Sequence, residues 1–231
     1  DAVTTVSRTH AEEIQYQYFA HGLADILRNN AYKLSGIVNG INTEIFNPAT
    51  DPALPQNFSA ADLSGKAVCK AALQKELGLD ENPDVPMIAM VTRLVGHKGI
   101  DLLKYLMDEL MRWNIQLVIL GTGDPMYEDF LRRCAEYNPK KLSVNLRFDS
   151  GLASRIYAGA DIYLMPSRSE PCGLSQLIAM RYGTVPLVRE TGGLKDTVPP
   201  LDPTTMQGAG FTFKSYNAYD MLDAITRCVT F

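Results

Sequence analysis

Two cations, Arg93 and Lys98, stand five residues apart on a glycine-punctuated loop that directly follows the apolar run Met87–Val91. Arginine offers a bidentate fork for phosphate oxygens, and lysine acts as a point charge. Because the loop leads into a predicted helix, the pair is suited to binding a phosphate group. A solvated basic loop on the surface explains the same residues, and the loop alone does not decide between the two.

A carboxylate follows a second apolar run, Ile162–Met165. Glu170 stands just before a predicted helix whose first turn contains Gly173. The N–H groups and partial positive charge of a helix N-terminus suit a diphosphate or sugar hydroxyls. Alternatively, Glu170 serves only as a partner for the dipole of that helix.

Two glycine loops follow further apolar runs: Gly121-Thr122-Gly123 comes after Gln116–Leu120, and Thr191-Gly192-Gly193 comes after Val185–Val188. A single Gly-x-Gly is more often just a tight turn. Ligands of open parallel sheets bind at the carboxyl ends of the strands, so four such loops at one edge are stronger than any one of them. We interpret them together as a site for a nucleotide diphosphate or a sugar phosphate.

Short apolar runs alternate with amphipathic segments along most of the chain, and several runs are apolar at nearly every position. This pattern predicts an α/β fold with a doubly wound parallel sheet covered by helices on both faces. Predicted strands are Ala2–Val6, Ser35–Val38, Met87–Val91, Gln116–Leu120, Val144–Arg147, Ile162–Met165, Val185–Val188 and Gly210–Phe213. Predicted helices are Lys66–Leu77, Gly99–Arg112, Pro125–Tyr137, Leu152–Ala158, Gly173–Tyr182 and Ala218–Val229.

Two regions break the alternation. Ser7–Asn30 reads as a helical connector, and Asn42–Ser64 reads as a long ordered loop. We expect a single parallel-sheet domain from about Ser35 to Phe231, with the residues before it poorly anchored, because chain termini are mobile unless they dock.

The composition narrows the classes of partner. The 231 residues include 22 Lys+Arg and 26 Asp+Glu, a net charge of −4, which argues against a nucleic acid or an anionic membrane. No apolar run is long enough for a transmembrane helix. The four cysteines are scattered and there are three histidines, so we expect reduced thiols and no zinc site. Because the chain begins at Asp1 without a leader, we expect it to be a piece of something longer.

Longer stretches then point to a family. Glu170 to Leu177 read EPCGLSQL, residues 191–198 read TGGLKDTV, and residues 35–42 read SGIVNGIN. With Thr92-Arg93-Leu94 and Lys98-Gly99, these segments closely resemble bacterial glycogen synthases and plant starch synthases, the ADP-glucose-dependent enzymes of glycosyltransferase family 5. The resemblance runs from about residue 3 to the C-terminus.

The resemblance implies a GT-B architecture, in which two Rossmann-like halves face each other across a cleft. It implies transfer of glucose from ADP-glucose to the non-reducing end of an α-1,4-glucan, with retention and without a metal or other cofactor. This chain resembles the C-terminal, donor-binding half: residues 1–34 would be a connector and remnant of the N-terminal half, and residues 35–231 the nucleotide-sugar-binding domain. We expect a cytoplasmic location in a bacterium, or a plastid in a plant or alga.

Site roles also follow from the resemblance. Arg93 and Lys98 match the pair that binds the donor diphosphate, and Glu170 matches the acidic residue at the sugar; these three are the expected catalytic residues. Asn39 matches a residue facing the acceptor. The expected donor-binding residues are Gly121, Thr122, Phe148, Cys172, Gly173, Leu174, Ser175, Thr191 and Gly192.

Some of these residues have simpler interpretations. Phe148 matches an aromatic residue that stacks on adenine, but aromatic side chains are usually in the core. Cys172 could be an inert buried thiol. His97 lies between the two cations and is best read as a solvated loop residue rather than a catalyst.

Two other functions remain open. One is a retaining GT-B transferase that uses a UDP-sugar, although many such enzymes carry a second Glu eight residues after the first, where this chain has Ile178. The other is a non-catalytic nucleotide-binding module. If the chain is the donor-binding half of a glucan synthase, we expect it to bind ADP weakly in isolation and to show negligible transfer, because the N-terminal half of the cleft is missing.

Overall fold

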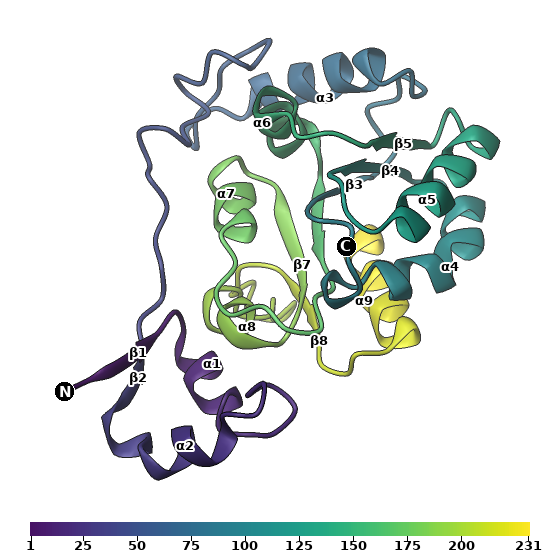
Figure 1. Ribbon diagram of the computed structural model, residues 1–231. Helices are drawn as coiled ribbons and strands as arrows, with labels where there is room; N and C mark the ends of the chain where they lie inside the picture. The colour runs from purple at the N-terminus through teal and green to yellow at the C-terminus, as the bar shows by residue number, and fades with distance from the viewer.

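The computed structural model describes residues 1–231, and at its centre lies a six-stranded sheet in which all neighbouring strands run parallel (Figure 1). In spatial order the strands are β5 (Leu142–Asn145), β4 (Gln116–Leu120), β3 (Met87–Val91), β6 (Ile162–Met165), β7 (Val185–Arg189) and β8 (Phe211–Phe213).

The central strands are apolar on both faces because each face meets its own layer of helices. In β3, Ile88 and Met90 point into one hydrophobic core, whereas Met87 and Ala89 point into the other. The same alternation holds in β4. Side chains of a strand alternate between faces, so an unbroken apolar run is what a sheet covered on both sides requires.

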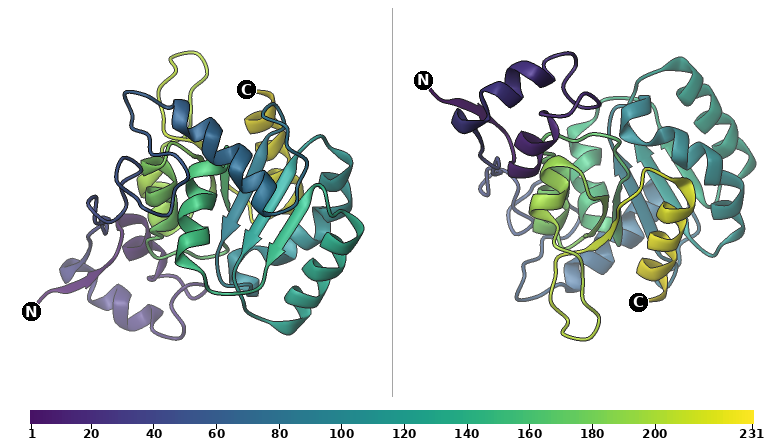
Figure 2. Two further views of the ribbon diagram at one scale, coloured as in Figure 1. Left: turned by 90° about the horizontal axis from the view of Figure 1, so that it is seen from above. Right: turned by 90° about the horizontal axis from the view of Figure 1, so that it is seen from below.

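Helices cover the sheet from both sides (Figure 2). One core is shared with α4 (Ile100–Arg112), α5 (Pro125–Tyr137) and α9 (Ala218–Thr230). The other is shared with α3 (Ser64–Glu76), α6 (Ser150–Gly159) and α7 (Ser175–Arg181). The predicted doubly wound α/β fold is therefore confirmed.

The order of the strands reverses once. From β3 the chain winds outward through β4 to β5, then returns to place β6 on the opposite side of β3 and winds outward again through β7 to β8. The ends of β3 and β6 are thus neighbours whose following loops diverge. In open α/β sheets this switch point is where ligands bind.

The strand at Ser35 does not begin the main sheet, contrary to our expectation. It forms β2 (Leu34–Gly36), which pairs with β1 (Val3–Thr5) in a separate two-stranded parallel sheet. These strands, with α1 (Arg8–Glu13), α2 (Ala24–Asn29) and the 3₁₀ turn Ala31–Lys33, form a small N-terminal lobe. Gly36 lies against the backbone of Ser7, where an added Cβ would stand 1.9 Å from a carbonyl oxygen, and this close contact holds β2 to the lobe.

The expectation that the first residues are poorly anchored is also wrong. Helix α1 packs against α8 (Gly192–Thr197), as the views of Figure 2 show. Thr9 donates hydrogen bonds to the carboxylate of Asp196 from both its backbone N–H and its hydroxyl, at 3.0 and 2.6 Å. Ser7 is fully buried. The division of the chain into domains at residue 34 stays a prediction.

Several element boundaries differ by one to three residues from those expected, and at two of them the structure gives the reason. β5 begins two residues before the predicted strand at Val144, because Leu142 pairs in register with Leu117 of β4. Helix α7 begins at Ser175 rather than at Gly173, because Gly173 has φ +71°, in the left-handed region that a right-handed helix does not use.

The long loop between β2 and α3 is ordered, as expected. Asn57 donates hydrogen bonds to the carbonyls of Pro48 and Asp51, and Tyr182 donates one to the Asp51 carboxylate at 2.5 Å. Burial and the Asp51 carboxylate raise the pKa of Tyr182, which keeps its hydroxyl protonated as a donor. Separately, none of the helices combines the length and apolar character needed to span a bilayer.

A partly buried lysine joins α3 to the helices beside it. The Lys66 ammonium donates hydrogen bonds to the carbonyls of Ala158, Ala160 and Tyr182 and to the Thr184 hydroxyl, at 2.7–3.3 Å. These carbonyls lie at the ends of α6 and α7, where helical partners are missing. Burial lowers the pKa of Lys66 to about 8.

This lysine predicts a pH dependence of stability. Between pH 8 and 10.5 the unfolded chain still holds the Lys66 proton that the folded chain has lost, so this group makes the free energy of unfolding rise with pH. The free energy of unfolding of the wild type minus that of Lys66→Met, measured by urea denaturation, should increase by about 2 kcal/mol from pH 8 to pH 10. Lys75→Met, on an exposed part of α3, is the control and should show no such trend. If the difference between the wild type and Lys66→Met stayed constant or fell with pH, this account would be wrong.

Candidate functional site

The loops that follow β3 and β4 are joined backbone to backbone. Leu94 donates its N–H to the carbonyl of Thr122 and accepts one from Asp124, at 2.9 and 2.8 Å. Gly121 lies so close to Thr92 that an added Cβ would stand 1.8 Å from its carbonyl oxygen. This contact brings Arg93 beside the glycine loop, as expected for two loops at one sheet edge.

The loops that follow β3 and β6 are joined by an ion pair across the switch point. Lys98 ends the 3₁₀ turn Gly96–Lys98, and its Nζ donates to Oε2 of Glu170 at 2.6 Å. The Ser167 hydroxyl donates to the same oxygen at 3.1 Å. Only 18% of the Lys98 side chain and 9% of the Glu170 side chain are exposed. The pair is therefore largely desolvated, and its attraction is stronger than that of a surface pair.

The loops that follow β6 and β7 are also in contact. Gly193 donates its N–H to the carbonyls of Glu170 and Pro171, at 3.1 and 3.2 Å. The neighbouring Gly192 has room for no Cβ, which would stand 2.0 Å from the Glu170 carbonyl oxygen. Cys172 is buried between these two loops. The start of α8 thus supports the segment that carries Glu170.

A cavity of about 390 Å³ opens at the end of β3 and β4. One exposed ring projects there, that of Phe148, which is 95% exposed and so is not a core residue. An apolar wall with a free aromatic face suits a nucleobase. The cavity is lined by Phe46, Val91, Thr92, Arg93, Leu120, Gly121, Thr122, Arg147, Phe148, Asp149, Ser150, Ala153, Ser154, Tyr157 and Ile178.

A smaller pocket of about 70 Å³ adjoins this cavity, and Val91 and Thr92 line both. It contains the Lys98–Glu170 pair and the turn before α7, so it offers a cation, a carboxylate and hydroxyls within a small volume. Such groups suit phosphate oxygens and sugar hydroxyls. Its lining is Met90, Val91, Thr92, Lys98, Tyr163, Leu164, Met165, Pro166, Ser167, Glu170, Gly173, Leu174 and Ser175.

The residues predicted from the sequence divide into four groups. Arg93, Gly121, Thr122 and Phe148 line the larger cavity, and Lys98, Glu170, Gly173, Leu174 and Ser175 line the smaller pocket. Cys172, Thr191 and Gly192 lie behind the pocket and line neither space. Asn39 is exposed on the segment that leaves the N-terminal lobe. The individual roles of all these residues stay predictions.

Sequence reasoning missed several side chains at this edge. Arg147 precedes Phe148 and lines the larger cavity, and a cation next to an aromatic residue after a strand is a signal that could have identified it. Phe46 reaches the cavity from the long loop. Tyr163 lies within β6, and its hydroxyl donates to the carbonyl of Val91 at 2.9 Å, a tie between strands that no local pattern reveals.

Burial and charge control the titration of two side chains here. Burial, followed by the cations Lys98 and Arg93, lowers the pKa of His97, so its ring is uncharged at neutral pH. Burial raises the pKa of Tyr163 well above its usual value, so its phenol stays a hydrogen-bond donor. Neither is poised to exchange a proton at neutral pH.

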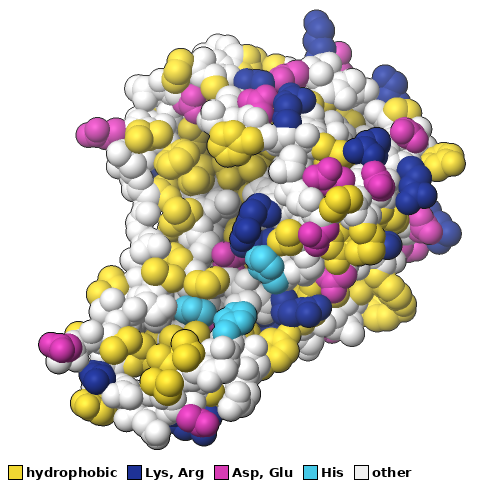
Figure 3. All heavy atoms as spheres, in the orientation of Figure 1, with side chains coloured by type: hydrophobic (Ala, Val, Ile, Leu, Met, Phe, Trp, Pro, Cys, Tyr) yellow, Lys and Arg dark blue, Asp and Glu magenta, His cyan; other side chains and the backbone are white.

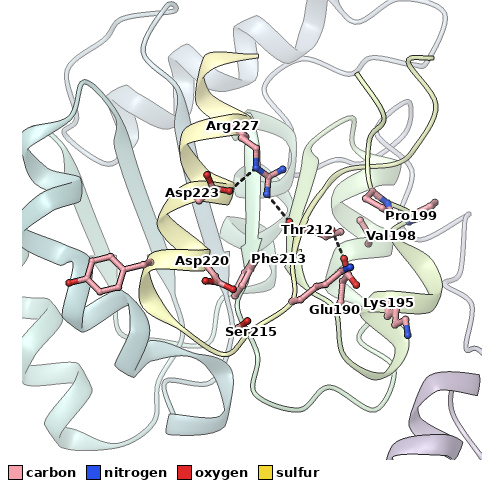
Figure 4. Close-up of a pocket in the computed structure, with 13 residues that line it drawn as sticks. Glu190, Lys195, Val198, Pro199, Thr212, Phe213, Ser215, Asp220, Asp223 and Arg227 are labelled. Atoms are coloured by element: carbon pink, nitrogen blue, oxygen red, sulfur yellow. Dashed lines mark hydrogen bonds and ion pairs between the residues drawn. The ribbon is translucent and has the colours of Figure 1, made fainter. Parts of the chain in front are cut away.

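Figure 3 shows that the face of Figure 1 is hollowed between the N-terminal lobe and the main body, with lysine or arginine, acidic and histidine side chains gathered at the hollow. A larger cavity, of about 900 Å³, lies elsewhere, along α8, β8 and α9 (Figure 4). There Arg227 binds Asp223 and the Thr212 carbonyl, and the Thr212 hydroxyl binds Glu190. These charged groups bind one another, and none of the predicted site residues lines this cavity.

Comparisons with known proteins agree with the fold and place the chain among glycosyltransferases. Residues 73–230 match the family model described as "Glycosyl transferases group 1". The chain is 52% identical over 225 residues to a glycogen synthase of Clostridium perfringens, covering 97% of this chain and 47% of that protein. It is 53% identical over 227 residues to a glycogen synthase of Lactobacillus acidophilus, covering 98% and 48%.

Among solved structures, the catalytic domain of starch synthase IV from Arabidopsis thaliana, bound to ADP and acarbose, superposes with a TM-score of 0.92 at 38% identity. The match covers 99% of this chain and 48% of the plant chain. The chain thus spans about half the length of the curated relatives it matches. The prediction of a Rossmann-like half of a GT-B glycosyltransferase is confirmed.

The Lys98–Glu170 pair predicts a strong energetic coupling. Lys98→Ala and Glu170→Ala should each destabilise the fold, because each leaves an unpaired charge in a desolvated place. The double variant should be more stable than the sum of the two losses suggests, with a coupling of roughly 1–3 kcal/mol in urea denaturation. The exposed pair Arg227–Asp223 on α9 is the control, with an expected coupling of about 0.5 kcal/mol or less. Equal coupling in both pairs would refute this assignment.

Proposed function

The chain belongs to the group 1 glycosyltransferases, and on this basis we propose that it is the donor-binding half of a glycogen or starch synthase. The longer enzyme would transfer glucose from ADP-glucose to the non-reducing end of an α-1,4-glucan with retention of configuration. The observation that carries the proposal is the Lys98–Glu170 ion pair at the switch point, which lines the smaller of the two adjoining cavities. A cytoplasmic or plastid location stays a prediction.

The donor would lie across both cavities. Adenine stacks on the exposed ring of Phe148 in the larger one, and the diphosphate extends past Arg93 towards Lys98. Lys98 has three N–H donors and gives one to Glu170, so the others can bind phosphate oxygens. The glucosyl group then reaches the smaller pocket, where the Glu170 carboxylate accepts hydrogen bonds from its hydroxyls.

In the reaction, the bond between the anomeric carbon and the diphosphate oxygen breaks, and a new bond forms to the terminal hydroxyl oxygen of the glucan. The proton of that hydroxyl leaves with ADP. Negative charge grows on the β-phosphate as the bond breaks, so two fixed cations stabilise the transition state more than the bound donor. Because Arg93 and Lys98 supply this positive charge, the proposal requires no metal.

The alternative of a UDP-sugar donor has less support. Ile178 lines the larger cavity with an apolar side chain at the position where many relatives of that kind carry a carboxylate. A purely nucleotide-binding module would not need Glu170 beside the diphosphate cations. We therefore retain the ADP-glucose proposal and let ligand binding decide.

Calorimetry on this chain tests the donor. We expect weak binding of ADP and ADP-glucose, weaker or no binding of UDP-glucose, and negligible glucose transfer to glycogen because half of the cleft belongs to the N-terminal part of the longer enzyme. Phe148→Ala should weaken ADP binding by about 1–3 kcal/mol, the usual contribution of one base stacked on an aromatic ring. Tyr137→Ala removes another highly exposed aromatic residue away from the cavity and should leave ADP binding unchanged. Preference for UDP-glucose would disprove the proposal.

Kinetics of the full-length parent test the two cations. Arg93→Ala and Lys98→Ala should each lower kcat by about 10²–10³, with a much smaller rise in the KM for ADP-glucose, because each removes stabilisation of a developing charge. Arg93→Lys should rescue only partly, since lysine lacks the bidentate fork. His97→Ala, at an uncharged residue between them, is the control and should be nearly silent. If His97→Ala were crippling and the cations dispensable, the phosphate role of this loop would be wrong.

A further inference from the structure

A carboxylate from the N-terminal lobe binds the loop that follows β7. Glu13, the last residue of α1, accepts hydrogen bonds from the Thr191 hydroxyl at 2.8 Å and from the Gly192 N–H at 3.1 Å to each carboxylate oxygen. Thr191 is fully buried beneath it. The polar groups of Thr191 and Gly192 are therefore engaged by Glu13, 178 residues earlier in the chain, and not directed into either cavity.

Glu13 is held firmly where it makes these contacts. The Ser7 hydroxyl, which also caps α1, donates to the carbonyl of Pro171 at 2.6 Å. The start of α1 is therefore also bound to the loop after β6. Nδ1 of His10 lies 3.8 Å from the Glu13 carboxylate. Burial acts to raise the pKa of Glu13, but the contacts with His10, Gly192 and Thr191 outweigh it, so the pKa is lowered and the group is ionised at neutral pH.

The contacts continue from Glu13 to the ion pair. Gly192 receives the carboxylate on one side and abuts the Glu170 carbonyl on the other, where a Cβ would stand at 2.0 Å. Gly193 donates its N–H to that same carbonyl. The Glu170 side chain binds Lys98. Two successive contacts thus connect Glu13 to the carboxylate at the centre of the candidate site, although Glu13 lines neither cavity.

We propose that Glu13 is a positioning residue for the donor: by fixing the start of α8, it holds the backbone of Glu170 in the orientation that meets the sugar. This inference rests on the proposed function and adds to it a residue outside the donor-binding domain expected from the sequence. The sign of its effect separates positioning from charge alone. A second carboxylate near an anionic donor repels it, so removing the charge alone would strengthen binding, whereas loss of positioning weakens it.

The first experiment needs no ligand and uses Cys172 as a reporter. This thiol is 5% exposed and lies between Glu170 and Gly193, so its rate of alkylation by iodoacetamide measures opening of that loop. Cys69, 1% exposed in α3, is the reporter for global opening in the same molecule. The rates are read for each cysteine by mass spectrometry in the wild type, Glu13→Gln, Glu13→Asp and Glu12→Gln.

In Glu13→Gln, Cys172 should react about tenfold faster, the order expected when a hydrogen bond to a charged group is lost, while Cys69 is unchanged. Glu13→Asp keeps the charge, so the alkylation rate of Cys172 in this variant should lie between the rates in the wild type and in Glu13→Gln. Glu12→Gln removes the same charge from the exposed neighbouring residue and should match the wild type. An equal acceleration of both cysteines, or of neither, would overturn the positioning role.

The second experiment measures the ratio of the Kd values for ADP-glucose and ADP. Glu13→Gln should raise the Kd for ADP-glucose about tenfold and the Kd for ADP by less than about twofold, because only the sugar contacts Glu170. Tighter binding of ADP-glucose would show that Glu13 acts by charge alone and would overturn the inference. If the wild type bound neither ligand, the proposed function would fail, while the alkylation rates would still decide whether Glu13 holds the loop.

Discussion

The reversal of winding between β3 and β6 is the constraint on which the candidate site depends. The chain leads from β3 towards β4 on one side and from β6 towards β7 on the other, so the two loops that follow these strands diverge and leave a crevice. Lys98 and Glu170 meet across that crevice at 2.6 Å although they are 72 residues apart in the chain. The smaller pocket, which the pair lines, and the larger cavity that adjoins it both open at this edge of the sheet.

Close packing of the loops keeps the crevice in shape. Gly121 and Gly192 each lie against the carbonyl of a neighbouring loop at a distance that excludes any side chain. Backbone contacts of this kind leave few rotatable bonds between the strand ends and the functional groups. Such rigidity favours catalysis, because groups that are already oriented need no reorganisation when charge develops. The sheet therefore supplies not only the direction of the side chains but also their fixed separation.

Local pattern was enough to predict much of this arrangement. Arg93 and Glu170 were identified because each follows an apolar strand of a parallel sheet, and such strands end at one edge. The partner of a side chain cannot be predicted from local pattern, because it depends on the order of the strands: nothing in the sequence near Lys98 shows that β6 lies beside β3. For the same reason the pairing of β2 with β1 and the contact of Glu13 with Gly192 could not be predicted. The exposure of Phe148 was a choice between two interpretations that only the packing decided.

Helix α1 has a mechanical consequence for the small lobe. The lobe is joined to the main body covalently by the segment after β2 and non-covalently where α1 touches α8 and Pro171. If the lobe rotated as a rigid body about the contact between α1 and α8, β1 and β2 would move most and the α1 contact least. The pivot lies directly behind the loop that bears Glu170. A part of the protein attached to the lobe would then move through a large arc, while Glu13, Gly192 and the loop that bears Glu170 kept their distances from one another.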